Sequence, residues 1–253
     1  MNAPGPTPYL TRTYRCVRLA CHFAWLGLGA ALVYPFVKDA RRRRLKQRWS
    51  RQILDILAIR LNADMAETPP GCLIVANHIS WLDIFAINSV RPAAFISKSE
   101  VRQWFFVGWL AARNDTVFLR RGSRGHARTV NSEIDNRLNA GRDVAVFPEG
   151  ATTDGTGLLG FHAALLQPAI ETGRPILPLA LSYHDAGGKR TTAASFAGDI
   201  PLLACFANIL ACRTLTVRIQ AAPIIDTQNR TRRELSQLAH AAIEERLTSC
   251  ALP

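Results

Sequence analysis

A histidine and a carboxylate five residues apart are the side chains best suited to acid–base chemistry in this sequence. They lie in the run Asn77-His78-Ile79-Ser80-Trp81-Leu82-Asp83. A neutral imidazole can take a proton from a hydroxyl, and a carboxylate on its second nitrogen would fix the tautomer and stabilise the imidazolium. We therefore predict His78 as a general base and Asp83 as the residue that orients it.

The spacing of this pair places a demand on the local structure. Five residues are about 1.4 helical turns, so the two side chains would diverge on one continuous helix. The pair needs a turn at His78, with Asp83 inside the helix that follows. In the alternative interpretation His78 caps that helix, and Asp83 only occupies its first turn, where the helix dipole favours a carboxylate.

Other charged residues also follow predicted strands. Glu149 and Gly150 come after the run Val144–Phe147, and a buried glutamate there needs a partner, for which Arg120-Arg121 is the candidate. Lys98 and Arg121 would add positive potential at the same strand ends, which suits a phosphate or an anionic lipid headgroup. The alternatives are an ordinary turn glutamate and solvated surface cations.

The elements that must position these residues alternate along the chain. Short apolar runs typical of buried strands are separated by segments with helical patterns. This alternation predicts an α/β fold with a mostly parallel sheet flanked by helices. The predicted strands are Leu73–Ala76, Ala94–Ser97, Thr116–Leu119, Val144–Phe147, Ile176–Leu181 and Leu215–Ile219, and the predicted helices are Trp81–Ser89, Ser123–Leu138, His162–Thr172 and Arg232–Leu247.

The N-terminal region indicates a membrane. The segment Leu19–Val37 is almost wholly apolar and would reach about 28 Å as a helix, enough to span a bilayer or lie in its interface. The basic block Lys38–Arg48 follows directly, as expected where a chain meets anionic headgroups on the cytoplasmic face of the inner membrane. A cleaved signal peptide and a buried core helix are the alternatives.

A domain boundary is predicted between residues 64 and 65. A helical pattern over Ile53–Leu61 leads to Pro69-Pro70-Gly71, a strong structure breaker. We therefore expect an N-terminal membrane-anchoring helical region over residues 1–64 and a catalytic domain over residues 65–253.

The composition limits the classes of partner that the chain could bind. The chain has 253 residues, a formal net charge of +12 and a pI near 10.2, which favours a nucleic acid, an anionic membrane or a phosphorylated substrate. The six cysteines lack the spacing of a metal site. The chain has no G-x-S-x-G nucleophile elbow, so we expect His78 to activate a substrate hydroxyl directly.

Four motifs in order give the chain a family resemblance. They are Asn77-His78 with Asp83, the strand end Val117-Phe118-Leu119-Arg120-Arg121, the run Phe147-Pro148-Glu149-Gly150, and the proline-bearing strand Pro175–Leu179. With these motifs the chain resembles the glycerolipid acyltransferases, whose best-known members are the 1-acylglycerol-3-phosphate acyltransferases.

The resemblance implies transfer of an acyl chain from acyl-CoA or an acyl-carrier protein to the hydroxyl of a lysolipid at an anionic membrane surface, in phospholipid biosynthesis. It implies His78 as base, Asp83 as its partner, and Arg121, Glu149 and Gly150 on the acceptor. Lys98 and Thr152 are further candidate substrate-binding residues. No metal, cofactor or nucleic acid is expected.

Two departures from the family pattern leave the acceptor headgroup open. Arg120 stands where many members have an acidic residue, and Ala151 stands where many have threonine. The following Thr152-Thr153-Asp154-Gly155 looks similar to acyltransferases acting on lyso-ornithine lipid, which is the alternative acceptor. A lipid hydrolase, in which the same pair activates water, and a membrane-tethered nucleic-acid binder are the alternatives from other classes.

Overall fold

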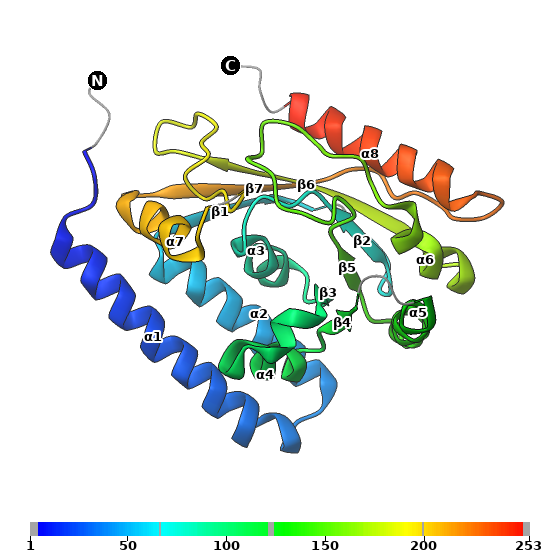
Figure 1. The fold of residues 1–253 in the computed structure, drawn as a ribbon, viewed down its shortest axis with the longest axis horizontal. Helices are drawn as coiled ribbons and strands as arrows, with labels where there is room; N and C mark the ends of the chain where they lie inside the picture. The colour runs from blue at the N-terminus through cyan, green and yellow to red at the C-terminus, as the bar shows by residue number, and fades with distance from the viewer. Residues whose placement is uncertain (1–4, 66, 121–123, 199, 250–253) are drawn as a thin grey trace.

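A seven-stranded sheet organises the chain. The structure, a computed structural model, describes residues 5–65, 67–120, 124–198 and 200–249 (Figure 1). The strand order is β1-β7-β6-β2-β5-β3-β4, and β6 and β7 form the antiparallel pair in an otherwise parallel sheet. The predicted α/β fold is confirmed. The strands are β1 (Ile59–Asp64), β2 (Leu73–Ala76), β3 (Ala94–Lys98), β4 (Val117–Leu119), β5 (Val144–Val146), β6 (Ile176–His184) and β7 (Leu215–Ala221).

Helices cover both faces of the sheet. Two apolar clusters form the core, one under α1, α2, α3, α4 and α7 and the other under α5, α6 and α8 (Figure 1). The central strand β2 is buried along its whole length, as its unbroken apolar run predicts. The α-helices are α1 (Tyr9–Leu32), α2 (Asp39–Ile56), α3 (Leu82–Val90), α4 (Phe105–Arg113), α5 (Arg124–Asn139), α6 (Gln167–Thr172), α7 (Leu202–Ala211) and α8 (Arg232–Ser249), and the 3₁₀ turns are η1 (Tyr34–Phe36), η2 (Ser99–Gln103) and η3 (Ala163–Leu166).

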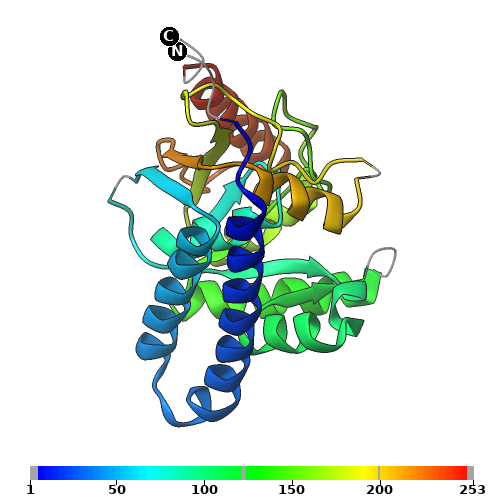
Figure 2. The same cartoon turned by 90° about the vertical axis from the view of Figure 1, so that its left-hand side faces the viewer.

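The first two helices lie side by side as a hairpin (Figure 2). Their close approach uses a small residue, because a Cβ on Gly29 would come within 2.6 Å of the Trp49 ring. Lys46 connects α2 to the residues next to β3 and α4. Its Nζ is buried and donates to the carbonyl oxygens of Ala93 and Asn114, at 3.0 Å each.

The apolar N-terminal helix differs in its bounds from the expected segment. It begins ten residues earlier, at Tyr9, and stops before Pro35, which lies in η1. Within the described residues, Tyr9–Phe36 is long and apolar enough to cross a membrane, and 28% of its most apolar window is buried.

The helical pattern predicted over Ile53–Leu61 is wrong in its second half. Helix α2 ends at Ile56, Ala58 turns the chain at φ 57°, and β1 then pairs in parallel with β7 at the edge of the sheet. A residue that ends a helix with a positive φ is usually glycine. Because an alanine occupies this position, the sequence carries no signal for the end of the helix. The predicted boundary at 64/65 therefore falls directly after a strand of the sheet, and the division into two domains stays a prediction.

The parallel strands bring distant segments to one edge. β2, β3, β5 and β6 run in the same direction, so the residues that follow their carboxyl ends meet at one side of the sheet. Open α/β sheets bind their ligands at this edge.

Candidate active site

The predicted histidine and aspartate meet at the end of β2. The chain turns at His78, and α3 begins at Leu82, so Asp83 lies in its first turn. The His78 Nδ1 and the Asp83 Oδ2 are 2.8 Å apart. The turn that this spacing requires is therefore present.

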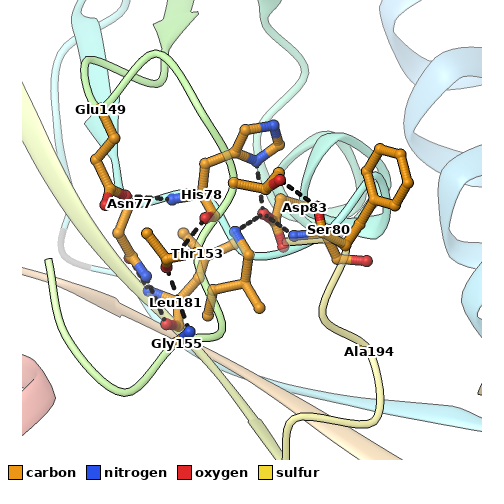
Figure 3. Close-up of polar contacts among 12 residues, drawn as sticks. Asn77, His78, Ser80, Asp83, Glu149, Thr153, Gly155, Leu181 and Ala194 are labelled. Atoms are coloured by element: carbon orange, nitrogen blue, oxygen red, sulfur yellow. Dashed lines mark hydrogen bonds and ion pairs between the residues drawn. The ribbon is translucent and has the colours of Figure 1, made fainter. Parts of the chain in front are cut away.

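Asp83 is fully buried and surrounded by hydrogen-bond donors (Figure 3). Its Oδ2 also accepts the backbone N–H groups of Ile79, at 2.7 Å, and Ser80, at 2.9 Å. Its Oδ1 accepts the Tyr183 hydroxyl at 2.7 Å. Burial, followed by the neighbouring Asp83 charge, raises the pKa of Tyr183 well above its usual value, so this phenol stays a donor.

This network assigns the protons of the imidazole. Because Asp83 is an acceptor for all its neighbours, the His78 Nδ1 carries the hydrogen of the neutral ring, and Nε2 keeps its lone pair. In Figure 3 the second ring nitrogen points away from Asp83. The His78 side chain is 20% exposed, so one side of the ring is open to a substrate.

An aromatic stack holds the plane of the imidazole. The Phe147 ring lies 3.9 Å from the His78 ring, centroid to centroid, with 9° between the planes. Phe95 of β3 lies behind Phe147 at 5.9 Å. The ring is thus fixed by stacking on one face and by Asp83 at one edge.

Glu149 is buried, and its carboxylate joins two loops. Its Oε1 accepts the backbone N–H of His78 and its Oε2 that of Leu159, both at 2.8 Å. Burial raises the pKa of Glu149, and these two N–H groups oppose that rise. The arginine partner expected for Glu149 does not occur within the described residues, because the two backbone amides already satisfy the carboxylate.

The other predicted substrate-binding residues differ in how they are placed. Gly150 turns the chain at φ 71° directly after Glu149. Lys98 is exposed at the carboxyl end of β3. Thr152 donates its hydroxyl to the carbonyl oxygen of Phe196. Arg121 lies outside the described residues. Their roles on the substrate stay predictions.

Asn77 was quoted only as part of a motif, and its structural role was missed. Its Oδ1 accepts the N–H of Leu181 at 2.7 Å, and its Nδ2 donates to the Leu181 carbonyl oxygen at 3.0 Å. The side chain thereby continues the pairing of β2 with β6 beyond the end of β2. A buried polar side chain directly after an apolar run is the signal for such a role.

The segment after Gly150 also supports the His78 turn. The N–H of Thr153 donates to the His78 carbonyl oxygen at 2.8 Å. Gly155 has φ 82°, and a Cβ there would come within 2.9 Å of Ile79 Cδ1. This segment, which the sequence relates to the choice of acceptor, therefore also supports the turn that bears His78.

The surroundings of His78 favour direct activation of a substrate. Ser80, the hydroxyl nearest to it along the chain, is fully buried. No group of three or more His, Cys, Asp or Glu side chains able to hold a metal lies in the described part of the chain. A partly exposed imidazole backed by a buried carboxylate is an arrangement that can take a proton from a hydroxyl or from water.

The comparisons with known proteins narrow this class. The family model described as "Acyltransferase" matches residues 60–182. A Neisseria meningitidis protein named 1-acyl-sn-glycerol-3-phosphate acyltransferase is 37% identical over 220 residues, which are 86% of each chain. A Pseudomonas aeruginosa protein named lyso-ornithine lipid O-acyltransferase is 36% identical over 230 residues, 91% of this chain and 88% of that one.

A solved structure agrees in fold. The crystal structure of the 1-acyl-sn-glycerophosphate acyltransferase from Thermotoga maritima superposes with a TM-score of 0.75 over 96% of both chains, at 20% identity. With the relatives above, the chain belongs to the acyltransferase family, and the resemblance found in its motifs is confirmed.

Proposed function

We propose that this acyltransferase moves a fatty acyl chain from a thioester donor to the free hydroxyl of a lysolipid, and that 1-acylglycerol-3-phosphate is its main acceptor. The observation that carries the proposal is the His78–Asp83 pair at 2.8 Å, with the second imidazole nitrogen facing outward. The names of two Neisseria relatives, at 37% and 41% identity, support the choice of acceptor.

The reaction follows from this geometry. His78 Nε2 takes the proton of the acceptor hydroxyl as its oxygen attacks the thioester carbonyl carbon. The resulting imidazolium is stabilised by the buried Asp83 carboxylate. The tetrahedral intermediate then breaks its C–S bond, and the leaving thiolate receives the proton from His78. General-base catalysis of this kind contributes on the order of 100-fold to 10,000-fold in rate.

The acceptor headgroup would lie beside the cations Lys98 and Arg121, which come in the sequence at the ends of two neighbouring strands. Lys98 is exposed at the strand end next to the one that bears Glu149, and Arg121 follows β4. These side chains suit the phosphate of 1-acylglycerol-3-phosphate. Glu149 and Gly150 would contribute through the backbone that they hold in place, since both Glu149 oxygens already accept N–H groups.

Lyso-ornithine lipid is the second candidate acceptor. Its support is the Thr152-Thr153-Asp154-Gly155 segment and a relative of that name at 36% identity. The Thr152 hydroxyl donates within the protein and Asp154 is exposed, so this segment offers a carboxylate rather than a cation near the headgroup. A carboxylate there suits the ammonium of an amino acid headgroup better than a phosphate.

The proposed location is the cytoplasmic face of the inner membrane. Helix α1 supplies the apolar anchor, and the basic block at the start of α2 follows it on the side where positive charge favours the cytoplasm. Both proposed donors, acyl-CoA and acyl-carrier protein, are cytoplasmic.

The test uses purified full-length protein, labelled acyl thioester and each of the two lysolipids. We expect the diacyl product from 1-acylglycerol-3-phosphate, more slowly from lyso-ornithine lipid, and at least 100-fold less product with His78→Ala. His240→Ala, on α8 at the opposite face of the sheet, is the matched control and should keep full activity. Free fatty acid as the sole product would assign the chain to the hydrolases, and faster use of lyso-ornithine lipid would reverse the choice of acceptor.

A further inference from the structure

An exposed aromatic corner lies where η2 turns into α4. It consists of Trp104, Phe105, Phe106 and Val107, whose exposed fractions are 51%, 97%, 38% and 49%. Soluble proteins rarely leave such a contiguous apolar run on the surface without a partner. The sequence pattern predicts neither a helix nor a strand for this segment.

The corner is held by backbone contacts, so its exposure is a feature of the fold. The N–H of Gly108 donates to the Trp104 carbonyl oxygen at 2.6 Å. A Cβ on Gly108 would come within 2.4 Å of the Arg102 carbonyl oxygen, so only glycine allows η2 and α4 to fold back on each other here. This tight turn projects the aromatic side chains outward.

The corner packs against α1. Phe106 packs on Gly27, where an added Cβ would lie 3.0 Å from the ring, and both views place α4 beside the second half of α1 (Figures 1 and 2). On α1 the neighbouring Trp25, Leu28 and Leu32 are 62%, 55% and 64% exposed. The corner therefore contacts a helix that carries exposed apolar side chains of its own.

Exposed basic side chains lie on the elements that flank the corner. Lys98, Arg102, Arg113 and Arg120 are exposed on the elements next to the corner, beside the single exposed carboxylate of η2, Glu100. Two of the guanidinium groups lie over aromatic rings, Arg102 over Phe118 and Arg113 over Trp109. Aromatic and apolar side chains flanked by cations match the interface of an anionic bilayer.

We propose that the aromatic corner is a second membrane-contacting element, which enters the headgroup region of an anionic bilayer beside α1. An acidic carrier protein would be attracted by the cations, but it would not account for the exposed aromatic side chains. A phenylalanine that is 97% exposed gains most from a hydrocarbon phase. This proposal deepens the proposed function and rests on it for one of its two readouts.

The position of the corner gives it a use in catalysis. Strand β3 ends at Lys98 and leads directly through η2 to Trp104, while Phe95 of the same strand stacks on Phe147, which in turn stacks on His78. A bilayer that holds the corner therefore lies near the edge of the sheet where the base is located. A lysolipid would reach His78 from the lipid boundary.

The first test measures insertion without reference to activity. Full-length protein is bound to vesicles of anionic phosphatidylglycerol and brominated phosphatidylcholine, and the quenching of tryptophan fluorescence is compared with that of Trp104→Phe. We expect the wild-type protein to show an additional quenched component that Trp104→Phe lacks. Equal quenched fractions in both proteins would overturn the proposal.

The second test compares substrates. Phe105→Ser should lower acyl transfer to lysolipid in anionic vesicles about tenfold, from the lost burial of one phenylalanine. It should leave transfer to a short-chain, water-soluble lysolipid unchanged within about twofold. Leu238→Ser, an exposed leucine on α8, is the matched control and should change neither rate.

The remaining outcomes separate the two proposals. An equal loss on both lysolipids, or no loss on vesicles, would overturn the membrane role of the corner. A selective loss with acyl-carrier protein as donor, without a change in quenching, would assign the corner to that protein instead. If the wild-type protein transfers no acyl chain to any acceptor, the proposed function fails, and the quenching experiment still decides the fate of the corner.

Discussion

The His78–Asp83 pair and the aromatic corner are opposite in how the fold treats them. Asp83 is fully buried, and both of its oxygens have donors within the protein. Phe105 is almost fully exposed and finds no comparable packing. The difference agrees with the two roles proposed above: catalysis would require groups that the protein itself holds in place, while contact with lipid would require a surface that the protein leaves exposed.

The largest expected effect comes from breaking the buried network at its centre. Asp83→Asn removes the negative charge that stabilises the imidazolium, and its NH₂ would face either the Tyr183 hydroxyl or the three donors that Oδ2 now accepts. We expect kcat to fall about 100-fold to 10,000-fold. Steady-state kinetics on soluble lysolipid measures this, with thermal unfolding as the control for folding. A fall of less than about threefold would contradict the role of Asp83.

Glu149→Gln tests whether the Glu149 carboxylate stabilises the turn at His78. The carboxylate accepts N–H groups at both oxygens, whereas an amide has one acceptor and would direct its NH₂ at one of the two donors. We expect the free energy of unfolding to fall by about 1 to 3 kcal/mol. Denaturant titration measures it. An unchanged midpoint would show that the two hydrogen bonds do not hold the loops together.

Tyr183→Phe removes one hydrogen bond from Asp83 and leaves its volume almost unchanged. The buried Oδ1 loses its donor at 2.7 Å. We expect about a tenfold loss in kcat with KM unchanged, since the hydroxyl positions the carboxylate and does not touch the lipid. If KM rises instead and kcat is unchanged, Tyr183 acts on substrate binding and not on the base.

A pH-dependent effect on stability is expected where the helical hairpin meets the sheet. Burial lowers the pKa of Lys46 from 10.5 to about 8. Between these values the unfolded chain binds more protons than the folded chain, so this group makes the free energy of unfolding rise with pH, by at most about 1.4 kcal/mol per pH unit. Denaturant titrations from pH 7.5 to 10 should show this rise in the wild-type protein relative to Lys46→Met. Parallel curves would contradict it.

The central sheet could be predicted because its signals are local. The run Leu73–Ala76 forms β2 with the predicted bounds, since an unbroken apolar β-branched run reports burial directly. Strand β1 was missed because it follows α2 through Ala58 without a glycine or proline, and its edge position leaves polar residues along it. Helix α4 was missed because its aromatic residues face outward, contrary to the pattern of a soluble helix.

The contacts of the active site also divide into a local one that could be predicted and long-range ones that could not. His78 and Asp83 lie five residues apart, so their meeting depends on one turn and could be predicted. The donors that complete the network come from elsewhere, above all Tyr183, which lies 100 residues beyond Asp83 in the sequence and is brought to it by the pairing of β6 with β2. Within the described residues, both Glu149 oxygens accept backbone N–H groups, which no sequence pattern reports, and the expected pairing of Glu149 with Arg121 stays a prediction because Arg121 lies outside those residues.

The central claim is that the protein holds His78 with its hydrogen on Nδ1 and a free lone pair on Nε2. Nitrogen-15 NMR of histidine-labelled protein in detergent tests this directly, with the His78 signals assigned by their loss in His78→Ala. We predict that the neutral ring is protonated at Nδ1 and unprotonated at Nε2, and that Asp83→Leu, which removes the acceptor from Nδ1, weakens this preference. A neutral ring protonated at Nε2 in the wild-type protein would contradict the assignment of His78 as the base.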